Sequence, residues 1–373
     1  MSRIPYWRAW LGTGWWNKLL SSRLAPSALS DVSTTPQNDQ APMYEDMENI
    51  ADFVGFYMKT GFWVERRLDL NSYRDALRLC GPSAEIAYTY ECVTFKVAIT
   101  IEGMVMLHHR ELAAAIPPMG DVEYFQDALV WWDSLLDYAY ALQALLESAT
   151  IRLEGPCEVN ATEIIPDNTA TIGMAGWSPV SSNADGNRVI GEEFRDLNRY
   201  VNFVGLHGRI PQHFDFSPYA WPEIKCSTLN RAIEQFEYVV AHPKLLKWVA
   251  FIIRAKVAYS KNDFSMSLIH SWFIIESACK HLYESDFPDA GLRSSRLSVA
   301  EISKILEERG RFSRVFVETL DKIRRLRNRL VHEPDCTRCS PEECRIAGQL
   351  AVDLATYEHE LELVLNWHCG VRF

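Results

Sequence analysis

Arg327, Asn328 and His332 are the side chains of this chain whose types and spacing best suit acid–base chemistry on a phosphate ester. Imidazole is the commonest general acid or base because its pKa lies near neutral pH. A guanidinium stays charged and can donate to two phosphate oxygens at once. Together the three residues supply a proton-transfer group, a phosphate-binding cation and a hydrogen-bonding amide, without a metal ion.

A predicted helix from about Phe312 to His332 carries these residues, because apolar side chains recur there every three or four positions. Glu333 precedes Pro334, and the residue before a proline is disfavoured in the helical conformation, so the helix should end at this point. Between Arg311 and His332 the chain has seven Lys or Arg and two Asp or Glu, although its formal net charge is −11. A basic segment in an acidic protein indicates a local polyanion site.

The spacing of the three residues leaves more than one arrangement open. Asn328 and His332 are four positions apart and share a helical face. Arg327 lies roughly 140° around an ideal helix from His332. Convergence of Arg327 and His332 on one phosphate therefore requires a bent helix end or the same motif from a second subunit. The plainer interpretation is a solvated basic helix with a capping histidine, since cations are common near helix C-termini.

The run Arg327-Asn328-Arg329-Leu330-Val331-His332 resembles the Arg-Asn-x-x-x-His motif of the HEPN superfamily, in particular ApeA-like HEPN ribonuclease domains. In that superfamily the motif ends a late helix of a small helical bundle, and one more helix follows. The same order is predicted here. The resemblance implies a metal-independent endoribonuclease that needs no cofactor and acts as a homodimer through its C-terminal domain, with the two motifs facing each other across a cleft.

The same resemblance implies a role for each residue of the motif. His332 would take the proton from a ribose 2′-hydroxyl or protonate the leaving oxygen. Arg327 would stabilise charge on the phosphoryl group, and Asn328 would orient or bind it, leaving a 2′,3′-cyclic phosphate end. The expected partner is RNA, for example tRNA. Three further arginines would hold the RNA backbone: Arg324, Arg325 and Arg329.

Glu276 falls within the apolar stripe of a helix predicted from about Asp263 to Tyr283. A carboxylate in such a place needs a partner. Related domains often carry an acidic residue on a helix that faces the motif, so Glu276 either orients Arg327 or forms a structural salt bridge. Related proteins commonly serve in phage defence or in toxin–antitoxin pairs, so a regulatory ligand or an antitoxin is a further expected partner.

Cys336, Cys339 and Cys344 follow the motif and offer an alternative, a structural zinc site. Zinc prefers four ligands, and a second CxxC or CxxH pair is missing nearby. His332 could not easily serve both as a zinc ligand and as a proton shuttle. Loop thiols without a chemical role are the plainer interpretation, and we expect no metal.

The composition of the chain is that of a soluble globular protein, with 373 residues, 48% hydrophobic and 23% charged. This length allows two domains and a substantial core. No uncharged apolar run is long enough for a membrane span, and the N-terminus lacks the apolar core of a signal peptide. Nine cysteines without an export signal predict reduced thiols in the cytoplasm.

The N-terminal half is predicted to be a mostly helical module of uncertain fold. Residues 1–42 combine a Trp-rich segment with a flexible linker. Residues 43–62 have apolar side chains at helical spacing, and 121–152 form the clearest helix. Residues 83–110 have the alternation and the β-branched side chains of strands, yet they continue without a break, which favours a buried helix. Residues 153–192 have the composition of a long loop.

We therefore predict a mainly α protein with a regulatory or sensor module at 43–222 and a HEPN-like helical bundle at 225–373. The bundle helices are expected at 227–240, 243–259, 263–283, 298–310, 312–332 and from 340 to about 365. The favoured function is a metal-independent endoribonuclease that the N-terminal module restrains. The alternative is a non-catalytic helical module that binds nucleic acid or protein.

Overall fold

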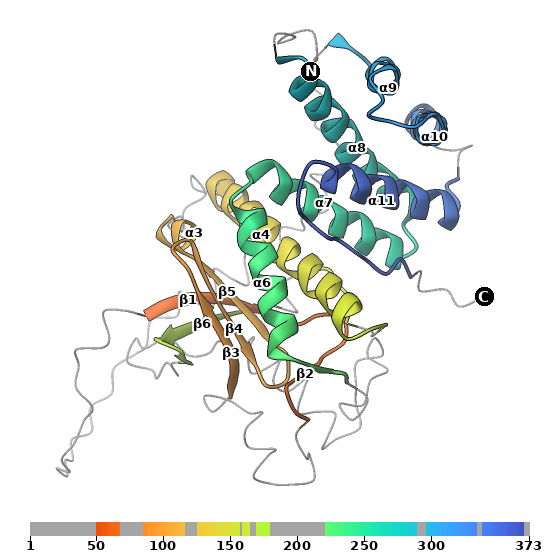
Figure 1. Cartoon of the computed structure of the whole chain (residues 1–373). Helices are drawn as coiled ribbons and strands as arrows, with labels where there is room; N and C mark the ends of the chain where they lie inside the picture. The colour runs from red at the N-terminus through yellow and green to blue at the C-terminus, as the bar shows by residue number, and fades with distance from the viewer. Residues whose placement is uncertain are drawn as a thin grey trace, which may run out of the picture.

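The computed structural model describes residues 50–67, 85–115, 125–156, 159–164, 169–179, 221–288, 296–333 and 338–368. Within these ranges the protein is mainly helical, with a small sheet in its N-terminal part (Figure 1), so the predicted fold class is confirmed at this level. The predictions for residues 1–42 lie outside the described ranges. None of the described helices combines the length and the apolar character that a membrane span requires.

A six-stranded sheet of order β3-β4-β5-β1-β6-β7, with antiparallel neighbours, forms the N-terminal part. A short helix, α3 (Arg110–Ala114), follows β5. The predicted mostly helical module is therefore wrong, because strands replace the helices expected at 43–62 and 83–110 and also occur in the expected loop at 153–192. The strands are β1 (Ile50–Phe56), β3 (Ile86–Glu91), β4 (Phe95–Thr100), β5 (Val105–His109), β6 (Thr169–Ala175) and β7 (Ser178–Pro179).

Strands β1, β4 and β5 escaped the sequence pattern because their described side chains are mostly buried on both faces. Phe56 of β1 belongs to the main core, whereas Phe53 belongs to a small second cluster. In β5, Leu107 faces the main core and Met106 faces the second cluster. A strand that is buried on both faces loses the alternation of apolar and polar residues, and its apolar run is then read as a buried helix.

Helix α4 (Phe125–Leu153) confirms the helix predicted at 121–152, and it packs against the first helices of the C-terminal part (Figure 1). One continuous core contains side chains of the sheet, of α4 and of the C-terminal helices, for example Val97, Leu145 and Phe236. A second, two-stranded sheet pairs β2 (Trp63–Val64) with β8 (Glu223–Ile224) in parallel. The predicted boundary near residue 222 therefore does not correspond to a gap in the core.

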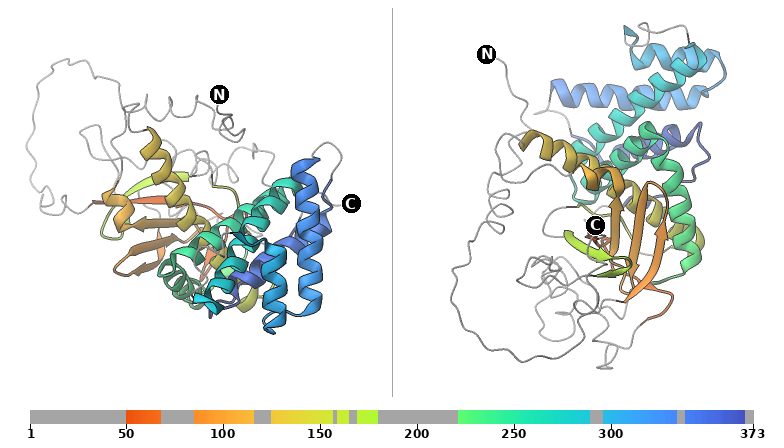
Figure 2. Two further views of the ribbon diagram at one scale, coloured as in Figure 1. Left: turned by 90° about the horizontal axis from the view of Figure 1, so that it is seen from above. Right: turned by 90° about the vertical axis from the view of Figure 1, so that its left-hand side faces the viewer.

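The C-terminal helices begin close to where their caps predict. Ser298 with Glu301, and Ser340 with Glu343, form the expected capping boxes. Helices α9 and α10 pack beside each other on the side of the bundle that lies away from the sheet (Figure 2). The helices are α6 (Cys226–Val240), α7 (Pro243–Ser260), α8 (Phe264–Asp286), α9 (Val299–Glu308), α10 (Arg314–His332) and α11 (Pro341–Thr356).

The C-terminal tail corrects the prediction that the last helix continues to about residue 365, because α11 ends at Thr356. The chain then runs back to α4, where the hydroxyl of Ser148 donates to the carbonyl of Glu362 at 3.0 Å and accepts from the N–H of Val364 at 2.9 Å. Leu361 and Leu363 are buried while the residues between and after them are exposed, which is the alternation of an extended segment.

Candidate active site

Helix α10 positions the predicted motif through its buried stripe and its caps. Its stripe consists of Leu320, Ile323, Leu326 and Leu330, which all face the core. At its start the hydroxyl of Ser313 accepts from the N–H of Phe316 at 3.2 Å. The helix ends at His332, as predicted, and Glu333 has left the helical conformation. The motif therefore occupies the last turn and a half of a regular helix.

Arg327 and Asn328 lie on the half-buried flank of α10, whereas His332 is exposed in its last turn. The Nη1 of Arg327 donates to the Oδ1 of Asn328 at 3.2 Å, so the amide orients the guanidinium. Because α10 stays helical to His332, the bent helix end that would bring Arg327 and His332 together is not found. One copy of the chain thus presents an oriented cation and an imidazole on different sides of the helix.

Glu276 on α8 binds a residue of its own helix. Its Oε1 accepts from the Nζ of Lys280 at 2.7 Å, and both side chains are about one-third exposed. This i,i+4 ion pair is the structural salt bridge that the sequence left open. The guanidinium of Arg327 donates to the side chain of Asn328 instead.

Asp321 is a charged neighbour of the motif that the sequence analysis did not single out. Its Oδ1 accepts from the Nε and Nη2 of Arg324, at 3.0 and 2.7 Å, and its Oδ2 lies 2.7 Å from the Nη2 of Arg325. The hydrogen bond from Arg324 is the main reason why the pKa of Asp321 is lowered, and the positive charges of Arg324 and Arg325 add to it. The spacing of three and four residues could have revealed these pairs.

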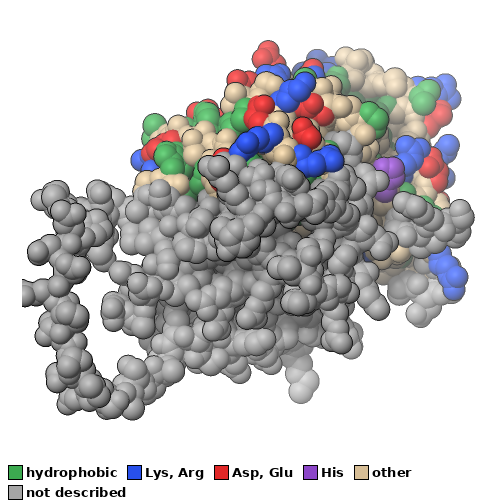
Figure 3. All heavy atoms as spheres, turned by 90° about the horizontal axis from the view of Figure 1, so that it is seen from below, with side chains coloured by type: hydrophobic (Ala, Val, Ile, Leu, Met, Phe, Trp, Pro, Cys, Tyr) green, Lys and Arg blue, Asp and Glu red, His purple; other side chains and the backbone are tan. Residues whose placement is uncertain are grey.

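Cationic and acidic side chains are interleaved on the surface as well as along this helix. On the face that Figure 3 shows, the described Lys and Arg side chains lie next to Asp and Glu side chains. The basic segment seen in the sequence is therefore partly neutralised within α10 itself, since Glu318 also lies 3.0 Å from Arg314. The cations of α10 that remain available for a polyanion are fewer than the sequence suggests.

The cysteines after the motif are buried side chains at the start of α11. Cys339 precedes the cap Ser340 and Cys344 lies in the first turns of α11, which are the two positions that commonly pack together at a helix start. The Sγ of Cys344 donates to the carbonyl of Phe264 at 3.1 Å. The neighbouring thiol of Cys344 lowers the pKa of Cys339, and the pKa of Cys344 is raised by the neighbouring thiol of Cys339 and by burial.

The zinc alternative gains no support from the described residues, which contain no group of three or more His, Cys, Asp or Glu placed to hold a metal ion. Cys336 lies outside the described ranges. The five described cysteines carry free thiols: Cys92, Cys226, Cys279, Cys339 and Cys344.

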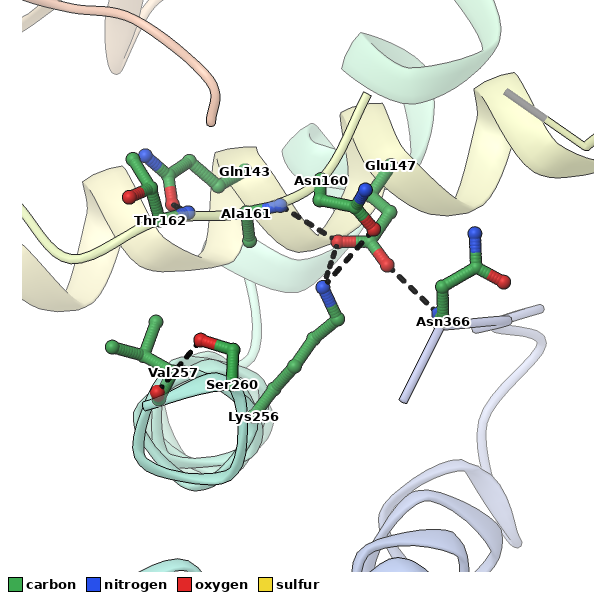
Figure 4. A network of polar contacts seen from close by, with 9 residues as sticks. All are labelled: Gln143, Glu147, Asn160, Ala161, Thr162, Lys256, Val257, Ser260 and Asn366. Carbon is green, nitrogen blue, oxygen red and sulfur yellow. Dashed lines mark hydrogen bonds and ion pairs between the residues drawn. The ribbon is translucent and has the colours of Figure 1, made fainter. Parts of the chain in front are cut away.

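A buried ion pair joins the two parts of the chain, and the sequence analysis missed it (Figure 4). The Oε2 of Glu147 on α4 accepts from the Nζ of Lys256 on α7 and from the N–H of Ala161, both at 2.8 Å. Its Oε1 accepts from the N–H of Asn366 at 2.9 Å. Burial lowers the pKa of Lys256, while the carboxylate of Glu147 acts in the opposite direction. Since all these bonds are internal, the pair serves to hold α4, α7 and the C-terminal tail together.

Comparison of the chain with family models, with curated proteins and with solved structures gave no match. The likeness to HEPN domains consequently depends on residues 327–332 and on the helices around them.

Proposed function

We propose that this protein is a metal-independent endoribonuclease of the HEPN type whose reacting groups lie at the end of α10. The observation that supports this most is the last part of α10, where a guanidinium oriented by an amide and a solvent-exposed imidazole occur within six residues. Cleavage of RNA by attack of a ribose 2′-hydroxyl on the adjacent phosphorus needs such a proton-transfer group and such a cation. The expected context remains phage defence or a toxin–antitoxin pair.

In the proposed reaction His332 removes the proton of a ribose 2′-hydroxyl, and the oxygen attacks the adjacent phosphorus. The bond from phosphorus to the 5′-oxygen breaks, and this oxygen takes up a proton from a protonated His332 or from solvent, which leaves a 2′,3′-cyclic phosphate and a 5′-hydroxyl. Arg327 stabilises the charge that develops on the phosphoryl oxygens, and Asn328 holds the guanidinium in place. Proton transfer by a positioned imidazole contributes on the order of 10²- to 10⁴-fold.

The complete site requires two copies of the chain. In one copy Arg327 and His332 point to different sides of α10, because the helix is regular up to its end. A two-fold arrangement would bring the Arg327 of one copy to the His332 of the other. We therefore expect activity to depend on protein concentration in the range where the dimer dissociates.

A non-catalytic binding module is the second candidate, and the ion pairs of the region favour it. Glu276 binds Lys280, and Asp321 binds Arg324 and Arg325, so no described acidic side chain prepares His332 for proton transfer. A binding module needs only the exposed cations of α10. The two candidates differ in whether His332 matters.

The test is cleavage of a mixed tRNA and single-stranded RNA pool by the full-length protein in EDTA. Wild type should produce cyclic phosphate ends, and Arg327→Ala and His332→Ala should each lower the rate by at least about 100-fold while RNA affinity changes little for His332→Ala. Arg314→Ala, an exposed arginine of the same helix, and His368→Ala, an exposed histidine of the tail, are the matched controls.

Two results would decide against the proposal. Cleavage that persists in His332→Ala would show that the reaction does not need the imidazole. Absence of cleavage by wild type across a range of protein concentrations, with RNA binding intact, would establish the binding module instead. The full chain must be used, because α4 packs against α6 and α7, and the fragment 225–373 would expose that apolar surface.

A further inference from the structure

Asp321 binds two arginines at once, six residues before Arg327, the first residue of the motif. Arg324 turns the edge formed by its Nε and Nη2 to one carboxylate oxygen, at 3.0 and 2.7 Å. Arg325 places its Nη2 at 2.7 Å from the other oxygen. The edge of Arg324 that Asp321 occupies is the same edge that could donate to two oxygens of a phosphate. A phosphate must therefore displace a carboxylate before it can bind this edge of the arginine in the forked geometry.

Other cations on the outer side of α10 are not held in this way. Among the described residues Lys322 and Arg329 take part in no ion pair, and both are exposed. With Arg325 and His332 they are spaced by three, four and three positions, so these four residues share one face of the helix. This face ends at the imidazole that the proposed reaction uses.

We propose that Asp321 is a specificity-determining residue, which withholds Arg324 and Arg325 from the RNA backbone and leaves Lys322 and Arg329 as the phosphate-binding cations beside His332. This inference rests on the proposed function and changes one of its details, since the resemblance implies backbone binding by Arg324 and Arg325 as well as by Arg329. Phosphate contacts carry no sequence information, so each withheld arginine lowers unspecific affinity for any polyanion. The carboxylate thereby limits the contacts to those next to the reacting group.

The salt dependence of RNA binding measures how many cations of the protein contact the RNA backbone. For a single strand, each phosphate contact contributes about 0.7 to the slope of log K against log salt concentration. Asp321→Asn removes the charge without a change of shape and frees two arginines, so the slope should steepen by about 0.7 to 1.4 and affinity at low salt should rise. Lys322→Gln and Arg329→Gln should each flatten the slope by about 0.7, whereas Arg324→Gln should leave it nearly unchanged.

Glu318→Gln is the matched control on the same helix. It changes the net charge by the same amount and also frees one arginine, Arg314, whose Nε lies 3.0 Å from the Oε1 of Glu318. That pair lies near the start of α10, away from the motif, and is more exposed, with 84% of the Arg314 and 57% of the Glu318 side chain accessible. If the position of Asp321 matters, Glu318→Gln should steepen the slope by clearly less than Asp321→Asn.

The experiment uses the full-length chain and a short fluorescein-labelled oligouridine in EDTA, with anisotropy read over a range of potassium chloride concentrations. All variants carry His332→Ala, so that the probe stays intact. The inference is overturned if Asp321→Asn and Glu318→Gln have the same effect, if Arg324→Gln flattens the slope as much as Arg329→Gln, or if Asp321→Asn does not bind RNA more tightly than its parent. The cleavage assay decides the proposed function separately, because a steepened slope without any cleavage would confirm the role of Asp321 in polyanion binding alone.

Discussion

Replacement of Lys256 by Met is the perturbation whose outcome the structure defines most sharply. The side chain of Glu147 is fully buried and that of Lys256 is 4% exposed. Water therefore cannot solvate either charge when its partner is removed. Methionine has an unbranched apolar side chain of nearly the same length as the lysine stem and lacks the ammonium group. The carboxylate of Glu147 would then keep the N–H groups of Ala161 and Asn366 as donors but have no cation.

Removal of one partner from a buried ion pair costs about 3–5 kcal/mol, because an uncompensated charge stays in a medium of low polarity. Because two backbone N–H groups still donate to the carboxylate, we expect Lys256→Met to lower the free energy of unfolding by about 3 kcal/mol, near the lower end of this range. With an m-value of about 3 kcal/mol per molar urea, the midpoint of unfolding should fall by about 1 M. The double variant Glu147→Gln with Lys256→Met should recover part of this loss, since it leaves no buried charge.

Urea unfolding followed by circular dichroism measures these changes, and Lys261→Met is the control. Lys261 follows the same helix and pairs with Glu163 of the same loop, but this pair is exposed, at 53% and 39%. Its loss should cost no more than about 1 kcal/mol. The reasoning would be refuted if Lys256→Met lost no more stability than Lys261→Met, or if the double variant were less stable than Lys256→Met alone.

Two further substitutions test other parts of the fold. In Gly348→Ala the new Cβ would lie 2.3 Å from the Cη2 of Trp367, so stability in urea should fall by about 1–2 kcal/mol, and a gain would show that the tail moves aside without cost. Glu102 is fully buried, its Oε1 accepts from Tyr57 at 3.4 Å, and burial raises its pKa from 4.5 to about 7. The folded state therefore keeps a proton that the unfolded state releases, so the contribution of Glu102 is complete below pH 4.5 and is lost as the pH rises through 7. Between pH 4.5 and 8, Glu102→Gln should lose roughly 3 kcal/mol less stability than wild type, and parallel curves would exclude this burial effect.

The C-terminal helices could be predicted from the sequence because their signals are local. The caps Ser298 and Ser340 mark where α9 and α11 begin, and the breaks after Val240 and Ser260 mark where α6 and α7 end. Each of these signals acts within a turn or two of the helix end that it marks. The divergence of Arg327 and His332 on α10 follows in the same way from their spacing. The i,i+3 and i,i+4 pairs of Asp321 and the pair of Glu276 with Lys280 were also within reach of spacing rules.

The sheet could not be predicted in this way, because the burial of its two faces is decided by segments that are distant in the chain. Phe53 and Phe56 have the spacing of a helix, and only the pairing of β1 with β5 and β6 makes them neighbours across a strand. The tail after Thr356 is a similar case, since its path depends on Ser148 more than 200 residues earlier.

The sequence by itself determined the composition class, the helices from α6 to α11 and the group of Arg327, Asn328 and His332 at a helix end, because each depends on residues within one or two turns. Only the tertiary structure decided that strands such as β1 and β5 are buried on both faces. It also brought Glu147 to Lys256, which are 109 positions apart and which no local pattern relates. A buried charge selects its partner through desolvation, and that cost exists only once the chain has closed around it.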